Sequence, residues 1–202
     1  MDSVPSQFAQ SLAMLRKVEQ TAVAFQIGSL IYNSRNNLST MAIERGVDYI
    51  LWLDSDMTFP PNTLIKLLED RDKGDIITGV YYRRVKPYHP VLFDKLEIKD
   101  DVCEWSDQLE IKDELFEVGG CGFGCVLTPT HVLVDVLSKY GNAFAPIGGV
   151  GEDLSFCWRA RECGYKIVCD PSIQCGHVGH YIIDQDFYKA FNEARKHESK
   201  DQ

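Results

Sequence analysis

Two aspartates follow directly on an apolar run in the stretch "YILWLDSDMTFPP", which covers residues 49–61. Alternate residues of an extended chain point to the same side, so Asp54 and Asp56 can reach one ion while Ser55 points away. Magnesium and manganese favour carboxylate oxygens of this kind. Aspartate is also common in turns. The spacing therefore predicts a divalent metal site, with a simple turn after a strand as the alternative.

A second pair of acids opens the segment "GEDLSFCWRARECG", residues 151–164, which is predicted to be a helix. A carboxylate in the first helical turn can offset the positive end of the helix dipole. Held firmly beside a substrate, the same group can accept a proton. Glu152 and Asp153 are therefore candidates both for helix capping and for a general base.

Histidines and arginines supply the remaining chemistry. Neutral histidine is a common metal ligand, which makes His177 and His180 of "CGHVGH" candidates. Arginine binds phosphate through paired hydrogen bonds, so Arg35, Arg83 and Arg84 are candidates for a diphosphate site. A structural histidine and a solvated surface arginine are the alternatives.

Alternating helix and strand patterns must position these residues. Helices are predicted at 5–20, 34–46, 60–72 and 151–164, and strands at 21–30, 48–54, 75–82 and 165–170. Residues 119–141 are predicted to form a strand followed by a helix. This order predicts an α/β fold with an open, mainly parallel sheet flanked by helices. Ligands bind beyond the carboxyl ends of such strands, where the two aspartates lie. From residue 86 a small antiparallel region follows. The glycines of "GGCGFG", residues 119–124, indicate close approach of a ligand or tight strand packing.

The composition limits the class of protein. A chain of 202 residues fits one domain, and its net charge of −9 argues against a nucleic-acid partner. No segment has the roughly 20 apolar residues that a membrane span needs. The seven cysteines form an odd set without a secretory signal, which predicts reduced thiols and a cytoplasmic location.

The ordered motifs resemble those of GT-A fold glycosyltransferases, most closely the small bacterial and phage-type family 2-like enzymes. The resemblance covers roughly residues 5 to 185 and rests on "LWLDSDMTFPPNTLIKLL", "GVYYRR", "GGCGFG" and "GEDLSFCWRARECGYKIVCDPSIQCGHVGH". It implies that Asp54 and Asp56 form the D-x-D that binds manganese or magnesium and the donor. It also implies that Asp153 is the base of an inverting enzyme, that His177 is a metal ligand, and that "GGCGFG" lines the acceptor side.

One departure from the family pattern concerns the start of the chain. "MDSVPSQFAQSL" resembles the segment that comes after the family's usual first strand, so residues 1–202 are expected to form a GT-A domain without that strand. Residues 186–202 are expected to form a C-terminal helix with a frayed end.

These observations predict a metal-dependent transferase that moves a sugar from a nucleoside-diphosphate sugar, in the first place a UDP-sugar, to an acceptor hydroxyl. A non-catalytic nucleotide-sugar or carbohydrate-binding module and a metallo-phosphoesterase are the alternatives. The predicted base is Asp153, the predicted metal ligands are Asp54, Asp56 and His177, and the predicted donor site comprises Arg35, Asp54, Asp56, Arg83 and Glu152.

Overall fold

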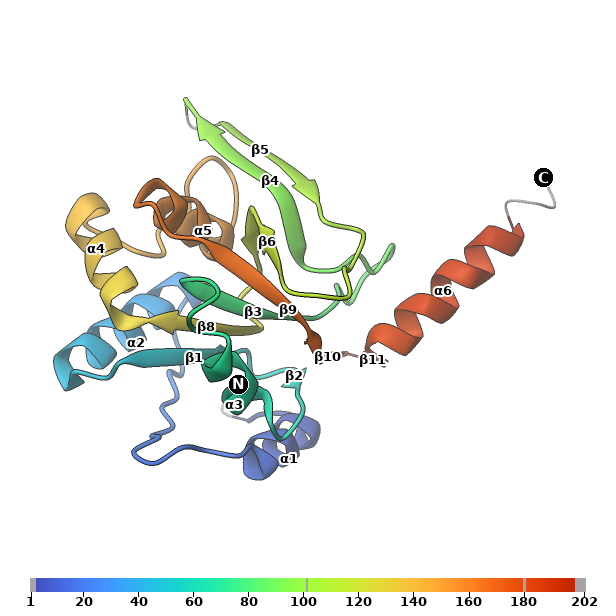
Figure 1. Cartoon of the computed structure of the whole chain (residues 1–202), viewed down its shortest axis with the longest axis horizontal. Coiled ribbons are helices and arrows are strands. Elements are labelled where there is room, and N and C mark those ends of the chain that lie inside the picture. Colours follow the sequence, from blue (N-terminus) through green and yellow to red (C-terminus); the bar gives the residue numbers. More distant parts are fainter. Residues whose placement is uncertain (1–2, 101, 180, 199–202) are drawn as a thin grey trace.

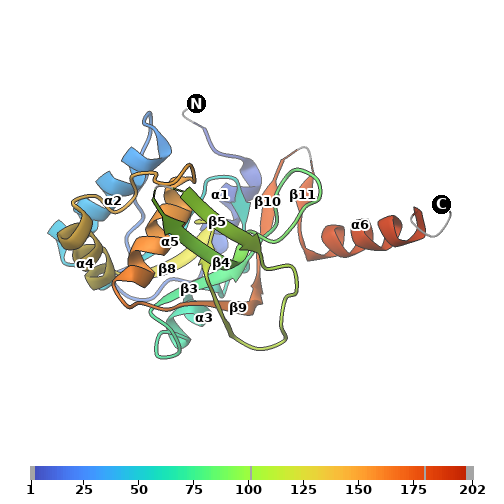
Figure 2. The ribbon, with the colours of Figure 1, turned by 90° about the horizontal axis from the view of Figure 1, so that it is seen from above.

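The computed structural model describes residues 3–100, 102–179 and 181–198, and its ribbon is shown in Figures 1 and 2. A central sheet lies between helices on both faces, and a smaller sheet stands over one end. The helices are α1 (Ser6–Met14), α2 (Ile31–Arg45), α3 (Thr63–Glu69), α4 (Thr130–Tyr140), α5 (Glu152–Glu162) and α6 (Gln185–Glu198).

The central sheet has five strands in the order β1-β8-β3-β9-β6. Its strands are β1 (Tyr49–Leu53), β3 (Ile76–Val80), β6 (Phe116–Val118), β8 (Cys125–Pro129) and β9 (Ile167–Gln174). The expected open α/β sheet is therefore present, but the expectation that it is mainly parallel is wrong. Only β3 and β9 are parallel neighbours, while β8 pairs antiparallel with both β1 and β3.

The direction of β8 has a physical cause in the path of the chain. After β3 the chain crosses the end of the sheet and re-enters through "GGCGFG", where the Gly124 carbonyl accepts a hydrogen bond from the Asp54 amide at 3.3 Å. A strand that starts beside the end of β1 must run back along it. Strands β1, β3 and β9 still share one direction, so their carboxyl ends meet at one edge of the sheet.

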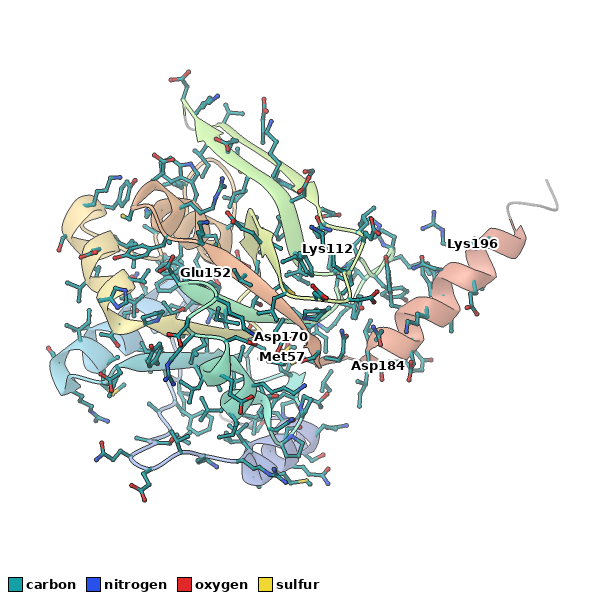
Figure 3. All side chains as sticks on the ribbon, viewed as in Figure 1. Met57, Lys112, Glu152, Asp170, Asp184 and Lys196 are labelled. Atoms are coloured by element: carbon teal, nitrogen blue, oxygen red, sulfur yellow. The ribbon has the colours of Figure 1, made fainter. Side chains whose placement is uncertain are left out.

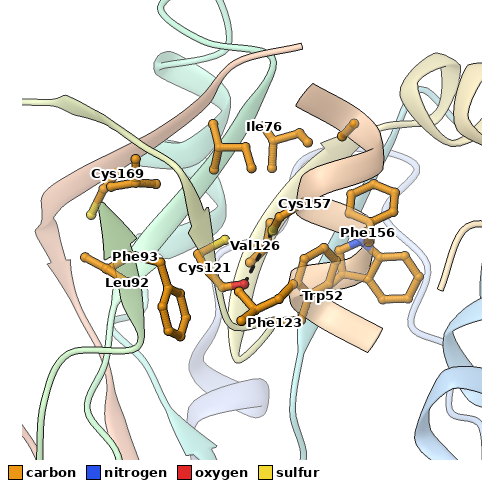
Figure 4. Close-up of a cluster of buried hydrophobic side chains, with 14 of the residues drawn as sticks. Trp52, Ile76, Leu92, Phe93, Cys121, Phe123, Val126, Phe156, Cys157 and Cys169 are labelled. Atoms are coloured by element: carbon orange, nitrogen blue, oxygen red, sulfur yellow. Dashed lines mark hydrogen bonds between the residues drawn. The ribbon is translucent and has the colours of Figure 1, made fainter. Parts of the chain in front are cut away.

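Alternation of apolar side chains along the strands gives the sheet two buried faces. In β3, Ile76 and Val80 pack in the core under α4 and α5, whereas Ile77 packs in the core under α1 and α3. The first core contains an aromatic group in which Trp52 of β1 contacts Phe123 and Phe144 (Figure 4). This packing fixes the sheet rigidly enough to position the side chains at its edge.

Residues 86–120 contain the antiparallel region that the sequence predicts. Strand β4 (Leu92–Lys99) pairs with β5 (Val102–Asp107) and with β7 (Gly120–Cys121). A third sheet consists of β2 (Met57–Thr58), β10 (Gly176–Val178) and β11 (Ile182–Ile183). The strand predicted at 165–170 is present as β9, but it continues to Gln174, and His177 lies on a further strand.

The strand predicted at 21–30 is also wrong. These residues have no strand structure and are exposed, and α2 begins at Ile31 with Leu30 as its N-cap residue, three residues before the expected start. The apolar pattern of "TAVAFQIGSL" favours a strand, but a strand forms only where a neighbour takes its hydrogen bonds. In the structure β1 pairs with β8 alone.

Helix α6 projects away from the rest of the molecule (Figure 1). Asp184 lies at its base and Lys196 near its far end (Figure 3). Residues 199–202 of the expected frayed tail lie outside the described part of the chain. Among the described helices, none is both long and apolar enough to cross a bilayer.

Candidate active site

The carboxyl ends of β1, β3 and β9 bring the predicted polar residues together. Asp54 and Asp56 follow β1, Arg84 follows β3, and His177 lies on β10, just after β9. The register of the β10–β2 pair fixes the position of His177, because it places His177 opposite Met57. Gly176 is required there, since a Cβ at this position would lie 2.6 Å from Ile182 Cγ2.

Arg35 forms the buried centre of one half of the site. Its guanidinium donates to Asp54 Oδ1 at 2.8 Å and to Glu152 Oε1 at 3.3 Å. Its side chain is only 6% exposed and lies over the rings of Trp52 and Phe123. Burial opposes the charged form, but the carboxylates of Asp54 and Glu152 outweigh it and raise the Arg35 pKa. Arg35 was predicted to bind phosphate, but in this structure both of its bonds go to carboxylates.

Asp56 forms the other half of the site. Its Oδ2 atom lies 3.0 Å from Arg84 Nη1 and 3.5 Å from His177 Nε2. Burial alone would raise the pKa of Asp56, but His177 and Arg84 outweigh this effect and lower it. The side chain of Arg84 is 48% exposed and that of Asp56 is 28% exposed, so ligands in solution can reach this pair.

The orientation of His177 bears on metal binding. Its Nδ1 atom lies 2.9 Å from the Tyr82 carbonyl, which fixes the ring when Nδ1 carries the proton. The Nε2 lone pair of such a neutral imidazole then faces the Asp56 carboxylate. Two acceptors directed at each other need a cation between them, which is either a proton on Nε2 or a metal ion. A carbonyl that orients the second nitrogen is usual for a histidine ligand.

Asp56 and His177 suit a divalent ion only as part of a larger ligand set. In the described part of the chain, no group of three or more His, Cys, Asp or Glu side chains is placed to hold a metal. Asp54 is already bound by Arg35. Magnesium-type sites often use one or two protein ligands and complete the shell with substrate phosphates and water. The residues present therefore fit an ion that binds together with a diphosphate.

Asp153 lies in the first turn of α5, and its pKa is raised above the usual value of an aspartate. Burial raises its pKa to about 6, and the neighbouring charge of Glu152 adds to the shift. The helix has Gly151 as its N-cap residue and no side-chain cap. Asp153 instead accepts a hydrogen bond from the amide of Leu154 at 2.7 Å. The carboxylate thus satisfies one free amide of the helix while its pKa is close to that of a general base.

Arg83 is not part of this group of residues. Its guanidinium donates to Asp107 Oδ1 at 2.6 Å and lies over the rings of Phe93 and Trp105. The same carboxylate lies 2.6 Å from His89 Nδ1. Arg83 is therefore bound by Asp107 in this structure, and its contact with the donor stays a prediction. Successive residues of an extended segment point to opposite sides, and Arg84 is the one that faces Asp56.

Tyr81 lies in the site, although no sequence pattern singles it out. Its ring contacts His177 edge to face at 5.5 Å, and its hydroxyl accepts the Gly124 amide at 3.3 Å. Burial raises the pKa of this hydroxyl, and Asp54 and Asp153 raise it further. "GGCGFG" packs around it, since a Cβ at Gly122 would lie 2.6 Å from Val91 Cγ1 and contact the Tyr81 hydroxyl. Tight packing thus explains these glycines. His180 lies outside the described residues.

Comparisons with known proteins show the fold but no family. No family model matches the sequence, and no curated protein matches it. The structure is similar to that of A197 from STIV, with a TM-score of 0.60 and 20% identity over 81% of this chain and 80% of that one. It is also similar to GalNAc-T7 with UDP, GalNAc and Mn2+, with a TM-score of 0.51 and 12% identity.

The second similarity covers 76% of this chain but only 31% of the GalNAc-T7 chain, so this chain spans about a third of that protein. At these identities the similarity shows the fold alone. The chain has a mixed α/β fold similar to that of a GT-A glycosyltransferase.

Proposed function

We propose that this protein transfers a sugar from a nucleoside-diphosphate sugar to an acceptor hydroxyl, with help from a divalent metal ion. The observation that carries the proposal is the meeting of Asp56, Arg84 and His177 at one edge of a GT-A-like sheet. Asp153 lies close enough to Asp54, at the same strand end, for the two charges to interact. A uridine nucleotide is the first choice of donor, because the GalNAc-T7 structure contains UDP with Mn2+.

Asp56 and His177 would hold the metal ion, with Asp54 kept in place beside them by Arg35. When bound, the ion offsets the negative charge that develops on the departing diphosphate. The side chain of Arg84 is 48% exposed, so its guanidinium would be able to leave Asp56 and contact a phosphate oxygen. The metal ion would then replace Arg84 as the positive partner of Asp56, and Arg84 would become the positive partner of the phosphate.

Asp153 has the properties of the base in this reaction. Its carboxylate accepts the proton of the acceptor hydroxyl while the acceptor oxygen forms a bond to the anomeric carbon. The bond between that carbon and the diphosphate oxygen breaks, and its electron pair leaves with the diphosphate. Direct attack of this kind inverts the anomeric centre. A base with a pKa of about 6 is ionised and still basic at neutral pH.

A screen of nucleotide sugars with manganese tests the proposal. We expect one donor to raise the melting temperature in the presence of metal and to release its nucleoside diphosphate when an acceptor is present. Binding without release in every acceptor mixture would favour a nucleotide-sugar-binding module instead. Release of inorganic phosphate from a phosphate ester would favour a metallo-phosphoesterase.

A further inference from the structure

A patch of apolar and basic side chains surrounds the base of α6, on the far side of Arg84 from the candidate site. Arg84 connects the two regions, because it contacts Asp56 and its Nη1 atom also lies 3.4 Å from the Val178 carbonyl. We call this surface the α6 patch, and its members come from the loop after β3, the β10–β11 turn and α6 itself: Val85, Lys86, Tyr88, Tyr181, Phe187, Phe191 and Arg195.

The tips of two loops carry exposed apolar side chains in the α6 patch. Tyr181 is 72% exposed and Val85 is 68% exposed, the two largest values among the exposed large apolar residues that the structure describes. Tyr181 stacks on Phe187, and Tyr88 contacts both Phe187 and Phe191 edge to face. Figures 1 and 2 both place β10 and β11 beside the base of α6. The apolar groups therefore form one continuous surface.

A groove with basic walls runs through the same surface. It has a volume of about 710 Å³ and is lined by Lys86, Pro87, Tyr88, Phe187, Phe191, Ala194 and Arg195. The Lys86 ammonium and the Arg195 guanidinium each lie 5.9 Å from the centre of the Phe191 ring. Residues 83–89, "RRVKPYH", contain three basic residues and no acid, in a chain whose net charge is −9.

We propose that the α6 patch binds the surface of an anionic lipid bilayer. Exposed apolar tips can enter the boundary between headgroups and acyl chains, and cations beside them attract anionic lipid. Tyrosine is a side chain that favours this boundary. Lys86 and Arg195 are both exposed, and each holds its charged group near the Phe191 ring, so the cations and the aromatic surface can reach the same lipid headgroup region. Binding of this kind would hold the protein at a membrane with Arg84 and Asp56 beside the contact.

The arrangement favours a bilayer over a folded protein partner. The most exposed apolar residues, Val85 and Tyr181, lie on separate loops, and the cations Lys86 and Arg195 belong to the same patch. Helix α6 extends from it as a projecting amphipathic helix. A protein interface has an apolar centre that is poor in charge. An anionic bilayer offers both apolar chains and negative headgroups, and because it is fluid it can contact the separate loops and cations of the α6 patch without a fixed complementary shape.

Sedimentation with lipid vesicles tests the proposal on the full chain. The protein should bind vesicles that contain phosphatidylglycerol and bind pure phosphatidylcholine vesicles weakly or not at all. Lys86→Ala and Arg195→Ala should each lower the partition coefficient by about fivefold, the value of roughly 1 kcal/mol for a basic residue near such a surface. The double variant Val85→Asp with Tyr181→Asp should lower it by on the order of tenfold or more, because two charges replace the inserting groups.

Matched controls lie on elements that do not contribute to the α6 patch. Val102→Asp changes a residue of β5 that is 64% exposed, and Lys166→Ala changes a cation of which the side chain is 67% exposed. Both should bind vesicles as the unchanged protein does, and all variants should keep its melting temperature. Absence of vesicle binding, equal binding to neutral vesicles, or equal losses in the controls would overturn the proposal. Pairing of two copies through the α6 patch, seen as a concentration-dependent mass without vesicle binding, would also overturn it.

Discussion

Asp153 combines burial with a neighbouring negative charge, and both effects raise its pKa, to about 6. Asp153→Asn should leave metal-dependent donor binding intact and lower the transfer rate by roughly two to four orders of magnitude, the usual contribution of a general base. The rate of the unchanged protein should rise with pH until about 6 and then level off, because the base acts when ionised. Donor affinity and turnover should be measured on one preparation, with Asp94→Asn, an exposed carboxylate of β4, as the control.

The same substitution has a predictable effect on stability. A carboxyl group whose pKa is higher in the native state than in the unfolded state loses stability as it ionises, so its cost is absent well below pH 4 and complete above about pH 6. Asp153→Asn should therefore stabilise the protein at pH 7.5 by on the order of 1 kcal/mol, with the gain fading at lower pH. Thermal unfolding across that range is the measurement. A loss of stability that does not vary with pH would mean that the carboxylate serves only the helix terminus.

Arg84 and Arg83 make a matched pair, because they are neighbours in sequence with different surroundings. Arg84→Ala should weaken binding of a nucleoside diphosphate by about tenfold, since a charge-assisted hydrogen bond contributes roughly 1.5–3 kcal/mol. Arg83→Ala should leave that affinity unchanged and instead lower stability, because it removes a cation held by Asp107 between Phe93 and Trp105. Calorimetric titration and thermal unfolding of both variants distinguish the two roles. Equal affinities in the two variants would exclude Arg84 from the ligand site.

At the scale of the elements, the segment "GGCGFG" can pack against Tyr81 before β8 because its glycines carry no side chain. Gly122→Ala should lower the free energy of unfolding by about 1–3 kcal/mol, because the added methyl group overpacks Val91 and the Tyr81 hydroxyl. Adding Tyr81→Phe to this variant removes the hydroxyl oxygen and should restore part of the loss. Denaturant unfolding of the single and double variants gives the coupling. A Gly122→Ala protein as stable as the unchanged one would disprove the packing argument.

Which elements the sequence could predict depends on how local their signals are. The end of α2 at Gly46, in a left-handed conformation, and the strand before Asp54 follow from residues near them. The direction of β8 depends on where the chain returns after residues 81–124, which no local pattern contains. The segment 21–30 has strand residues but no partner, and the sequence cannot show that a partner is missing.

The residues of the candidate site likewise include some that local motifs predict and some that they do not. Asp56 and His177 lie together, as the motifs at strand ends predict, whereas Asp54 is bound by Arg35. The choice between Arg83 and Arg84 could not be made, because Arg83 is held by Asp107, a residue placed by the register of the β4–β5 hairpin. Tyr81 carried no signal, since an aromatic residue in a buried strand is ordinary.

At the scale of the whole molecule, the sheet gathers charge of both signs at one edge. The chain has a net charge of −9, yet Asp54 and Asp56 each lie beside an arginine. Such pairing keeps an acidic site from repelling an anionic ligand. The seven cysteines are all free thiols, and five of them are buried. A cytoplasmic location remains a prediction.

His177 and His89 allow a matched test of the proposed metal site, since His89 is paired with Asp107 outside it. His177→Ala should weaken manganese-dependent nucleotide binding by about tenfold or more, the effect expected for loss of a ligand or its orienting contacts. His89→Ala should leave it unchanged. Manganese titrations at fixed nucleotide concentration provide the comparison, and equal small effects would mean that neither ring contacts the ion.

Calorimetric titration of UDP into the protein with and without manganese, repeated with Asp56→Ala, tests the proposed metal-dependent donor site most directly. We expect binding that requires the metal, falls by about tenfold or more in Asp56→Ala, and persists in the exposed control Asp94→Ala. Folding should be unchanged in both variants, because Asp56 lies at a strand end and not in the core. Metal-independent binding that survives Asp56→Ala, or binding that both variants lose equally, would contradict a donor site built on Asp56.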